Sequence, residues 1–274
     1  ILNGTSTFIL SRREEDSGDY GVVLAVAQEK GFAEADPAMD VDGTDATQKL
    51  AILAHLAFGV WVPWGEIPRT GVEGVDAELM SSAADLGYRI RLVAIASRSD
   101  GRIAMRVAPA LVKAGTPLAE TRGAFNAVSI VGDAVGPMFF HGLGAGQMPT
   151  ASAVVADIID TVVGRAAITF RTTGVLDADS PASRIEGAGM VQKHFLRARV
   201  DDRPGALSRI TGILGEHGIS IASVIQRDPA DHEGVPLVIM THACGTSAVA
   251  KAVAHIDASD VVSGGTICLG VLDD

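Results

Sequence analysis

The sequence is poor in aromatic residues and in cysteine. Only 4% of its 274 residues are aromatic, and the two cysteines, Cys244 and Cys268, both lie near the C-terminus. So few cysteines exclude a disulfide-rich scaffold, and we expect two buried thiols in a reducing compartment. Hydrophobic residues make up 47% of the chain. This is ample for a packed core, and the length suits one large domain or two unequal ones.

Positive charge and long apolar runs are scarce too. Lys and Arg number 22 against 33 Asp and Glu, for a net charge of −11. This balance argues against a nucleic-acid groove and a polybasic membrane patch. The longest apolar stretch, 50–62, is broken by His55, and a bilayer span needs about 20 apolar residues. With no segment like a signal peptide, we expect a soluble, cytoplasmic protein.

The first part of the chain, residues 1–171, alternates helix-like and strand-like patterns. The periodicity predicts helices at 21–29, 44–58, 76–86 and 150–163, and strands at 88–96, 102–108, 125–131 and 136–141. Gly31 is expected to end the first helix. The helix at 44–58 has apolar residues almost all round, so we expect most of it to be buried. Together these patterns predict an α+β domain with a mixed sheet.

A second domain is predicted after a linker. Residues 172–193 have weak periodicity and many Gly, Ser, Pro and Asp residues, which is typical of a linker. Residues 194–274 then read as strand, helix, strand, strand, helix and strand, with the last five elements at 204–218, 219–226, 235–241, 247–255 and 261–271. This βαββαβ order predicts an antiparallel ferredoxin-like sheet with both helices on one face, and an α/β protein overall.

An acidic stretch at 34–49, "EADPAMDVDGTDATQK", raises the question of a metal site. If Gly43 took the glycine position of a calcium-binding EF-hand loop, Lys49 would fall where a bidentate Glu is required. No His or Cys lies nearby at ligand spacing for a transition metal. We therefore expect no metal here.

Two interpretations of the acidic stretch remain open from the residues alone. In the first, Asp42 caps a solvated helix, Asp45 takes its third position, and Asp45 pairs with Lys49 one turn later. In the second, the lysine and the carboxylates bind a zwitterionic amino acid. The helix that follows Lys49 is otherwise apolar, so we expect this end of it to point into a cleft.

Three motifs bear on this choice. "LNGTSTFIL" at the start, "GFAEADPAMDVDGTDATQKLAILAHLAFG" at 31–59 and "GLGAGQMPTASAVVADI" at 142–158 resemble homoserine dehydrogenases. The C-terminal unit, with "DDRPGALSRIT" and "GISIASVIQ", is similar to an ACT domain, which follows the catalytic part in many bacterial members. The resemblance covers nearly the whole chain.

The resemblance implies an oxidoreductase of threonine, methionine and isoleucine biosynthesis. Such an enzyme passes a hydride between NAD or NADP and the alcohol carbon of homoserine, and interconverts homoserine with aspartate semialdehyde. The family binds its cofactor mainly through an N-terminal Rossmann domain. No GxGxxG motif occurs in the 274 residues and the first residue is Ile1 rather than Met. We therefore expect a piece that lacks this domain and is inactive alone.

The family's roles transfer to single residues of this chain. Lys49 and Asp45 match the lysine and the acid at the reacting centre, where they stabilise charge and relay a proton. Glu34 and Asp40 match residues that bind the substrate's amino group, and Thr5 matches one near substrate and nicotinamide. Asp36 and Asp42 are left to the turn and the helix cap.

One position departs from the family, because Thr7 stands where the family usually has Asn. The glycine-rich segment with Gly144, Ala145 and Gly146 would let the backbone approach the cofactor. Its alternative interpretation is a tight strand-to-helix turn.

In the ACT-like unit, Gly205 and Ala206 lie at the expected start of a helix, where amides can bind a carboxylate. The resemblance implies an amino-acid effector, with threonine as the candidate, and a homodimer or homotetramer. A structural turn is the alternative at this position. For the whole chain the alternatives are a non-catalytic amino-acid sensor and a dehydrogenase of another semialdehyde or hydroxy acid.

Overall fold

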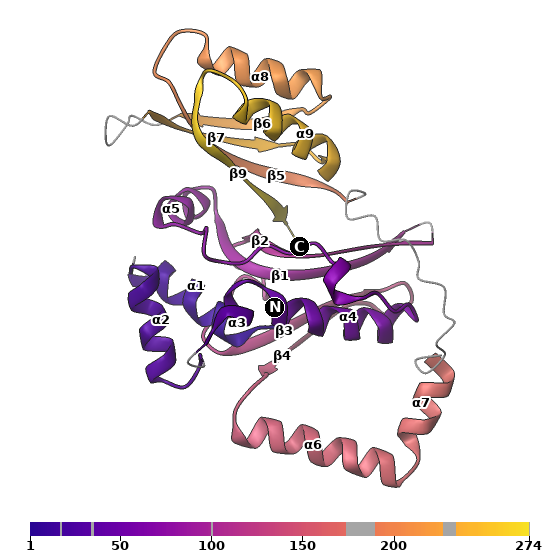
Figure 1. The fold of residues 1–274 in the computed structure, drawn as a ribbon. Coiled ribbons are helices and arrows are strands. Elements are labelled where there is room, and N and C mark those ends of the chain that lie inside the picture. The colour runs from indigo at the N-terminus through magenta and orange to yellow at the C-terminus, as the bar shows by residue number, and fades with distance from the viewer. Residues whose placement is uncertain (17, 34–35, 100, 174–189, 227–233, 274) are drawn as a thin grey trace. The chain divides into compact units, whose positions relative to one another are not determined.

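The computed structural model describes residues 1–16, 18–33, 36–99, 101–173, 190–226 and 234–273. The chain divides into two compact units (Figure 1). Unit 1 comprises Ile1–Ala77, Ile90–Pro109 and Gly115–Gly187, and unit 2 comprises Glu78–Arg89, Ala110–Ala114 and Ala188–Asp274. The α/β class is confirmed.

Unit 1 combines helices with two hairpins. Its helical elements are α1 (Gly4–Asp16), α2 (Tyr20–Glu29), α3 (Ala38–Val41), α4 (Thr44–Phe58), the short 3₁₀ helix η1 (Trp64–Glu66), α6 (Gln147–Val162) and α7 (Arg165–Thr173). Its strands are β1 (Tyr88–Ser99), β2 (Arg102–Lys113), β3 (Phe125–Gly132) and β4 (Gly136–Leu143), of which β1 and β2 extend into unit 2. All strands predicted for this part are present.

Glycines end two of these helices as their sequence suggests. Gly31, just after α2, has a φ of 71°, and Gly59, just after α4, has a φ of 70°. A side chain with a Cβ disfavours this left-handed conformation, so glycine is the residue that ends a helix here at least cost. The predicted position of Gly31 is therefore confirmed.

Helix α4 has the predicted bounds but not the predicted burial. Its inner face buries Leu50, Ala51 and Ala54, whereas Ile52 and Leu53 remain 53% and 37% exposed. The expectation that most of α4 is buried was wrong. The helix contacts the unit along one stripe, so apolar residues elsewhere on its circumference face outward.

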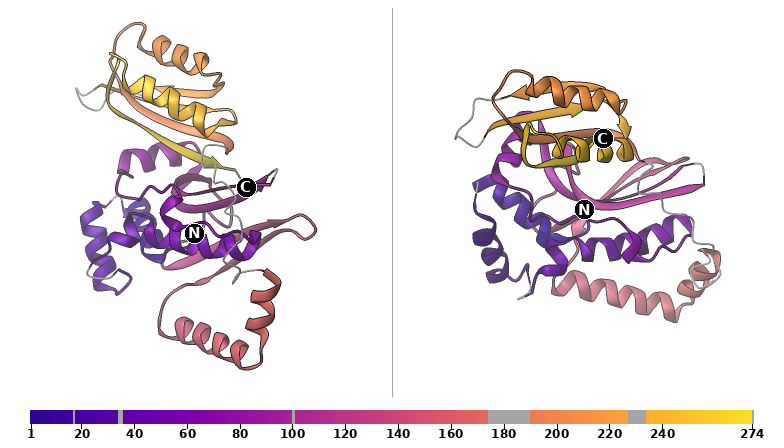
Figure 2. Two further views of the ribbon diagram at one scale, coloured as in Figure 1. Left: turned by 45° about the vertical axis from the view of Figure 1, so that its right-hand side comes forward. Right: turned by 45° about the horizontal axis from the view of Figure 1, so that its top comes forward.

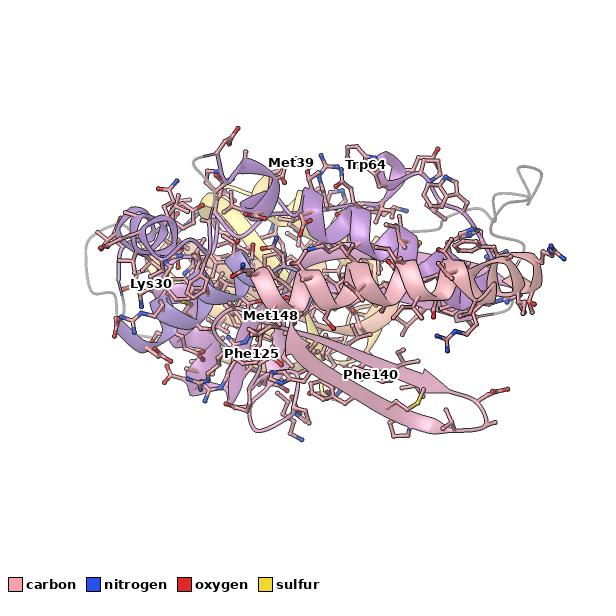
Figure 3. All side chains as sticks on the ribbon, turned by 90° about the horizontal axis from the view of Figure 1, so that it is seen from below. Lys30, Met39, Trp64, Phe125, Phe140 and Met148 are labelled. Atoms are coloured by element: carbon pink, nitrogen blue, oxygen red, sulfur yellow. The ribbon has the colours of Figure 1, made fainter. Side chains whose placement is uncertain are left out.

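Apolar exposure is most extensive on α6 and on the β3–β4 hairpin. Within α6, Val154, Val155, Ile158 and Val162 are 52–80% exposed. Figure 3 labels Phe140 on the hairpin and Met148 in the first turn of α6, and both are exposed. No helix among the described residues has the length and apolar content to cross a membrane.

Unit 2 is built around a sheet in which β9, β5, β7 and β6 pair antiparallel. Its strands are β5 (Val191–Val200), β6 (Ile221–Gln226), β7 (Val235–Thr241), the short β8 (Cys244–Gly245) and β9 (Val262–Leu272), and its helices are α5 (Ala77–Asp85), α8 (Ala206–Glu216) and α9 (Thr246–Asp257). Strands β9, β5, β7 and β6 lie in that order. Alternate residues of β5 and β7, such as Leu196 and Leu237, share one core with Ile210 of α8 and Ala252 of α9. Figure 2 shows α8 in orange and α9 in yellow beside these strands. This confirms the βαββαβ unit with both helices on one face.

Earlier parts of the chain also belong to unit 2. The end of β2 pairs in parallel with β9, from Ala110 opposite Gly270 to Val112 opposite Leu272. In α5, Glu78 accepts a hydrogen bond from Arg199 at 2.9 Å. The sheet is therefore mixed, which the prediction of a purely antiparallel unit missed.

The predicted linker, 172–193, falls largely on residues 174–189, which lie outside the described residues. Helix α7, which the sequence analysis did not predict, continues to Thr173, and β5 starts at Val191. Regular structure thus enters this range from both sides.

The cysteines differ from the expectation of two buried thiols. Neither Cys244 nor Cys268 is in a disulfide, but Cys268 is exposed and Cys244 is only half-buried. In β9, Leu269 and Val271 are buried. Successive side chains of a strand point to opposite faces, so Cys268 lies on the other face from these two.

Candidate functional site

The polar cluster at the start of α1 is organised by Asn3. Its Oδ1 accepts a hydrogen bond from the backbone N–H of Ser6 at 2.8 Å and so caps the helix. Its Nδ2 donates to Asp40 Oδ1 at 2.7 Å and to Asp45 Oδ2 at 2.8 Å. A side-chain amide offers both an acceptor and two donors, so this one group can cap α1 and hold two carboxylates together.

The carboxylates come from α3, α4 and the residues just before and between these helices (Figure 1). Asp36 accepts from the N–H of Ala38 at 3.1 Å, and Asp42 accepts from the N–H of Thr44 at 2.7 Å. Both residues thus serve the turn, as predicted. The N-cap of α4, however, is Gly43, with a φ of 84°, so Asp45 takes the second helical position rather than the third.

A close backbone contact supports this turn. The N–H of Val72 donates to the carbonyl oxygen of Val41 at 2.8 Å. A Cβ on Gly71 would overlap that oxygen and lie 2.7 Å from Cα of Asp42. Only glycine lets the 71–72 segment approach this closely, so Gly71 fixes the position of the turn that carries Asp40 and Asp45.

Lys49 joins the cluster from the next turn of α4. Its Nζ donates to Asp45 Oδ2 at 2.8 Å and to the carbonyl oxygen of Leu2 at 3.1 Å. This confirms the predicted Asp45–Lys49 pair. The Lys49 side chain is 46% exposed and that of Asp45 27%. The lysine is thus open to solvent and to a ligand, rather than enclosed in the cleft that we expected.

Asn126 of β3 extends the cluster to the glycine-rich segment. Its Nδ2 donates to the same Leu2 oxygen at 3.3 Å. Its Oδ1 is buried and has no hydrogen-bond partner within the described part of the chain. A Cβ on Gly144 would overlap Nδ2 of Asn126. The absence of a side chain at Gly144 therefore makes room for Asn126, which leaves a buried acceptor beside Lys49 and Leu2.

The rest of the glycine-rich segment connects β4 to α6. Gly146 is the N-cap of α6 with a φ of 116°, and Ala145 lies between the two glycines. This geometry fits the tight strand-to-helix turn. It leaves the predicted approach of Gly144, Ala145 and Gly146 to a cofactor as a prediction.

The threonines of α1 are committed to the backbone. Thr5 is 6% exposed, and its hydroxyl donates to the carbonyl oxygen of Phe32 at 2.5 Å. Thr7, the residue that departs from the family pattern, donates to the carbonyl oxygen of Asn3 at 2.8 Å. The Thr7 hydroxyl thereby donates to a backbone carbonyl at the first turn of α1. The side chain of Asn3, not that of Thr7, bridges Asp40 and Asp45.

The structure brings together Asp40, Asp45 and Lys49, and links them to Gly144 through Leu2 and Asn126. Glu34 lies outside the described residues. Sequence reasoning missed Asn3 and Asn126. Asn3 could have been found, because it stands where the helix-capping residue of α1 belongs. Asn126 carries no such local signal.

The candidate effector residues lie in unit 2 at the start of α8. Gly205 is the N-cap with a φ of 96°. The N–H of Ala206 donates to the carbonyl oxygen of Arg203 at 3.2 Å, so this amide already has a partner. The predicted carboxylate site at Gly205 and Ala206 stays a prediction.

The cluster has the groups to bind a small zwitterion. Two carboxylates held by one amide suit an ammonium group, and a partly exposed lysine beside them can stabilise negative charge on an oxygen. Over the ranges that the structure describes, no group of three or more His, Cys, Asp or Glu residues could hold a metal ion. The chemistry of this donor set is therefore that of carboxylates, amides and one ammonium.

Comparison with protein families gives two matches. Residues 1–159 match the model described as homoserine dehydrogenase, and residues 194–259 match the ACT domain. The first match contains every residue of the cluster.

Curated proteins and solved structures agree with these matches. The homoserine dehydrogenase of Pseudomonas aeruginosa is 36% identical over 99% of this chain and 64% of its own length. That of Bacillus subtilis is 36% identical over 88% of this chain and 56% of its own.

A crystal structure of a homoserine dehydrogenase from Thiobacillus denitrificans has a TM-score of 0.86 at 37% identity. The match covers 100% of this chain and 63% of that structure's chain. The chain thus spans roughly three fifths of the length of such relatives.

Proposed function

Because the chain belongs to the homoserine dehydrogenase family, we propose that it forms the substrate-binding and regulatory part of an enzyme that interconverts L-homoserine and L-aspartate 4-semialdehyde. The observation that carries this proposal is the Asp45–Lys49 pair tied through Asn3 to Asp40. It offers carboxylates for an α-amino group and a cation for an alcohol oxygen.

In the proposed reaction each residue acts on a stated atom. Asp40, together with Glu34, binds the ammonium group of homoserine. Lys49 lies beside the alcohol oxygen, stabilises the negative charge that develops as the hydride leaves carbon, and relays the hydroxyl proton. Asp45, whose Oδ2 accepts a hydrogen bond from Nζ at 2.8 Å, orients the lysine. Thr5 lies close to the substrate and the nicotinamide.

The cofactor in this proposal is NAD or NADP, which accepts the hydride. Residues 1–274 contain no GxGxxG motif, so we propose that a separate dinucleotide-binding domain holds most of the cofactor and that this stretch alone shows no turnover. In this proposal Gly144, Ala145 and Gly146 line the side of the site that receives the nicotinamide ring.

The test uses the native polypeptide with any residues that precede Ile1. Homoserine oxidation is followed by the absorbance of the reduced nicotinamide, with NAD and NADP in parallel and with L-serine and 4-hydroxybutyrate as comparison alcohols. We expect turnover of homoserine only, because serine misplaces the alcohol and 4-hydroxybutyrate lacks the ammonium group. Equal turnover of 4-hydroxybutyrate would contradict the role of the carboxylates.

Asn3 gives a prediction of its own. Asn3→Ser keeps an acceptor for the helix cap but removes both donors to Asp40 and Asp45. We expect kcat/KM for homoserine to fall about 10–100-fold, because the carboxylates lose their common anchor. For Asn3→Asp we expect kcat/KM to fall further, because a third carboxylate would then lie beside those of Asp40 and Asp45.

The control for Asn3 is a second helix cap. Asp19 caps α2 through the N–H of Gly21 at 2.8 Å, so Asp19→Ser makes the same kind of change outside the cluster and should leave kcat/KM unchanged. Steady-state kinetics and thermal melts of all variants separate positioning from stability. An Asn3→Ser protein with wild-type kcat/KM would remove Asn3 from the site.

For unit 2 we propose the regulatory role of an ACT domain, with an amino-acid effector whose carboxylate binds near Gly205 and Ala206. Threonine is the candidate, and the assembly is a homodimer or homotetramer located in the cytoplasm. Calorimetric titration with threonine, alongside isoleucine and lysine, tests the effector. Heat from lysine alone would contradict it.

A further inference from the structure

A second pair of reactive groups lies in unit 2, apart from the cluster around Lys49. Cys244 forms the short strand β8 with Gly245 and pairs with Gln192 at the start of β5. Its Sγ lies 3.6 Å from Nδ1 of His194 and 3.5 Å from Oγ1 of Thr241. These are hydrogen-bonding distances for sulfur.

The imidazole of His194 is held in a fixed place. The residue is 1% exposed, and its Nε2 lies 3.3 Å from the side-chain amide of Gln192. The oxygen and nitrogen of such an amide are interchangeable in assignment. With the oxygen toward His194, Nε2–H donates to it and the lone pair of Nδ1 faces the thiol.

Thr241 completes the surroundings of the sulfur. Its Oγ1 accepts from the backbone N–H of His194 at 3.0 Å, which leaves the hydroxyl hydrogen to donate to Sγ. The sulfur therefore lies within hydrogen-bonding distance of an imidazole nitrogen and a hydroxyl together. Such an arrangement of nucleophile, base and orienting group activates a thiol.

We propose that Cys244 and His194 form a thiol-modification site for low-molecular-weight disulfides. Cys244 is half-buried at the edge of the core of unit 2, while its base is fully covered. In the reaction the Cys244 thiolate attacks one sulfur of the small disulfide. A bond forms between the two sulfurs, the reagent's own S–S bond breaks, and the released thiolate takes the proton from His194. The cysteine is oxidised, and half of the reagent is reduced to a thiol.

The position gives such an adduct a local consequence. The residue after Gly245, Thr246, donates to the carbonyl oxygen of Met190 through its N–H at 3.0 Å and its hydroxyl at 2.9 Å. Modification of Cys244 would therefore occur two residues from the contact that holds the start of β5 to Thr246.

The test begins with the unaltered protein. Glutathione disulfide is added at pH 7, the reaction is stopped by acid at intervals, and the peptides are analysed by mass. Trypsin cleavage after Lys251 puts Cys244 and Cys268 on separate peptides. We expect Cys244 to form the mixed disulfide at least about fivefold faster than Cys268, although Cys268 is the more exposed. In guanidinium chloride the two rates should become equal.

Variants assign the effect to the imidazole. His194→Gln should bring the Cys244 rate down to that of Cys268 and leave Cys268 unchanged, with folding checked by circular dichroism. Gln192→Leu, at a partly exposed position, should lower the Cys244 rate several-fold even if His194→Gln fails to fold. Equal or slower reaction of Cys244 in the folded unaltered protein overturns the proposal, as does an unchanged rate in folded His194→Gln.

Discussion

Replacing Lys49 by alanine is expected to lower kcat for homoserine oxidation by about 10²–10⁴-fold. The ammonium group donates to Asp45 at 2.8 Å and to the Leu2 carbonyl at 3.1 Å, and it is partly open to a ligand. No other cation is hydrogen-bonded to these groups in the described residues. Alanine would therefore leave the developing alkoxide with no positive charge and the proton with no relay.

The measurement is steady-state kinetics on the native polypeptide, including any residues before Ile1. Lys49→Arg keeps the charge but not the point-like geometry or the ability to give up a proton, so it should restore little. Lys251→Ala, on the exposed side of α9, serves as the matched loss of a lysine and should leave kcat unchanged. Wild-type turnover by Lys49→Ala would refute the mechanism.

Gly71→Ala is expected to be damaging although it adds a single methyl group. That methyl would overlap the carbonyl oxygen of Val41 and crowd Cα of Asp42. Neither atom can move without shifting the turn that holds Asp40 and Asp45. We expect a loss of about 1–3 kcal/mol in unfolding free energy and about 100-fold in kcat/KM, since a displacement near 1 Å has that effect.

Gly74→Ala is the control for this variant. A Cβ at Gly74 meets no atom within 4 Å, and its φ is not positive, so both stability and activity should be retained. Thermal melts and kinetics on the two variants, three residues apart, make the comparison. Equal melting temperatures for both would show that the turn tolerates displacement and that Gly71 does not fix it.

Elements with a clear periodic pattern were predicted well. Helix α4 has the predicted bounds, and β7 matches the predicted strand at 235–241. In both elements, the conformation follows from the pattern of apolar and polar residues within the element itself. Helix α7 was missed; it follows Gly164, whose φ of 80° separates it from α6.

Features that depend on distant parts of the chain were not predicted. The parallel pairing of β2 with β9 joins residues near 111 and 271, and nothing in either strand signals the other. The same holds for Asn126, whose partner Leu2 lies 124 positions away. Gly71 reads as one glycine among 31 until the backbone beside it is known.

The candidate site was predictable mainly because the 31–59 segment is long and specific. From the residues alone, a capped surface helix and an amino-acid site both remained open as interpretations of Asp42, Asp45 and Lys49. The structure is compatible with both, since Asp42 accepts a hydrogen bond within the turn while the side chains of Asp45 and Lys49 are partly exposed. The bridging role of Asn3 required knowing that 1–3 and 40–45 are adjacent.

Unit 2 includes segments from earlier in the chain, so residues 188–274 alone are not an independent module. A fragment cut within 174–189 would lack β2 and α5, so the edge of β9 at 270–272 would be bare and Arg199 would lose the carboxylate of Glu78. Bare strand edges recruit other strands. Grafting unit 2 onto another protein therefore means transplanting 78–89 and 110–114 with it.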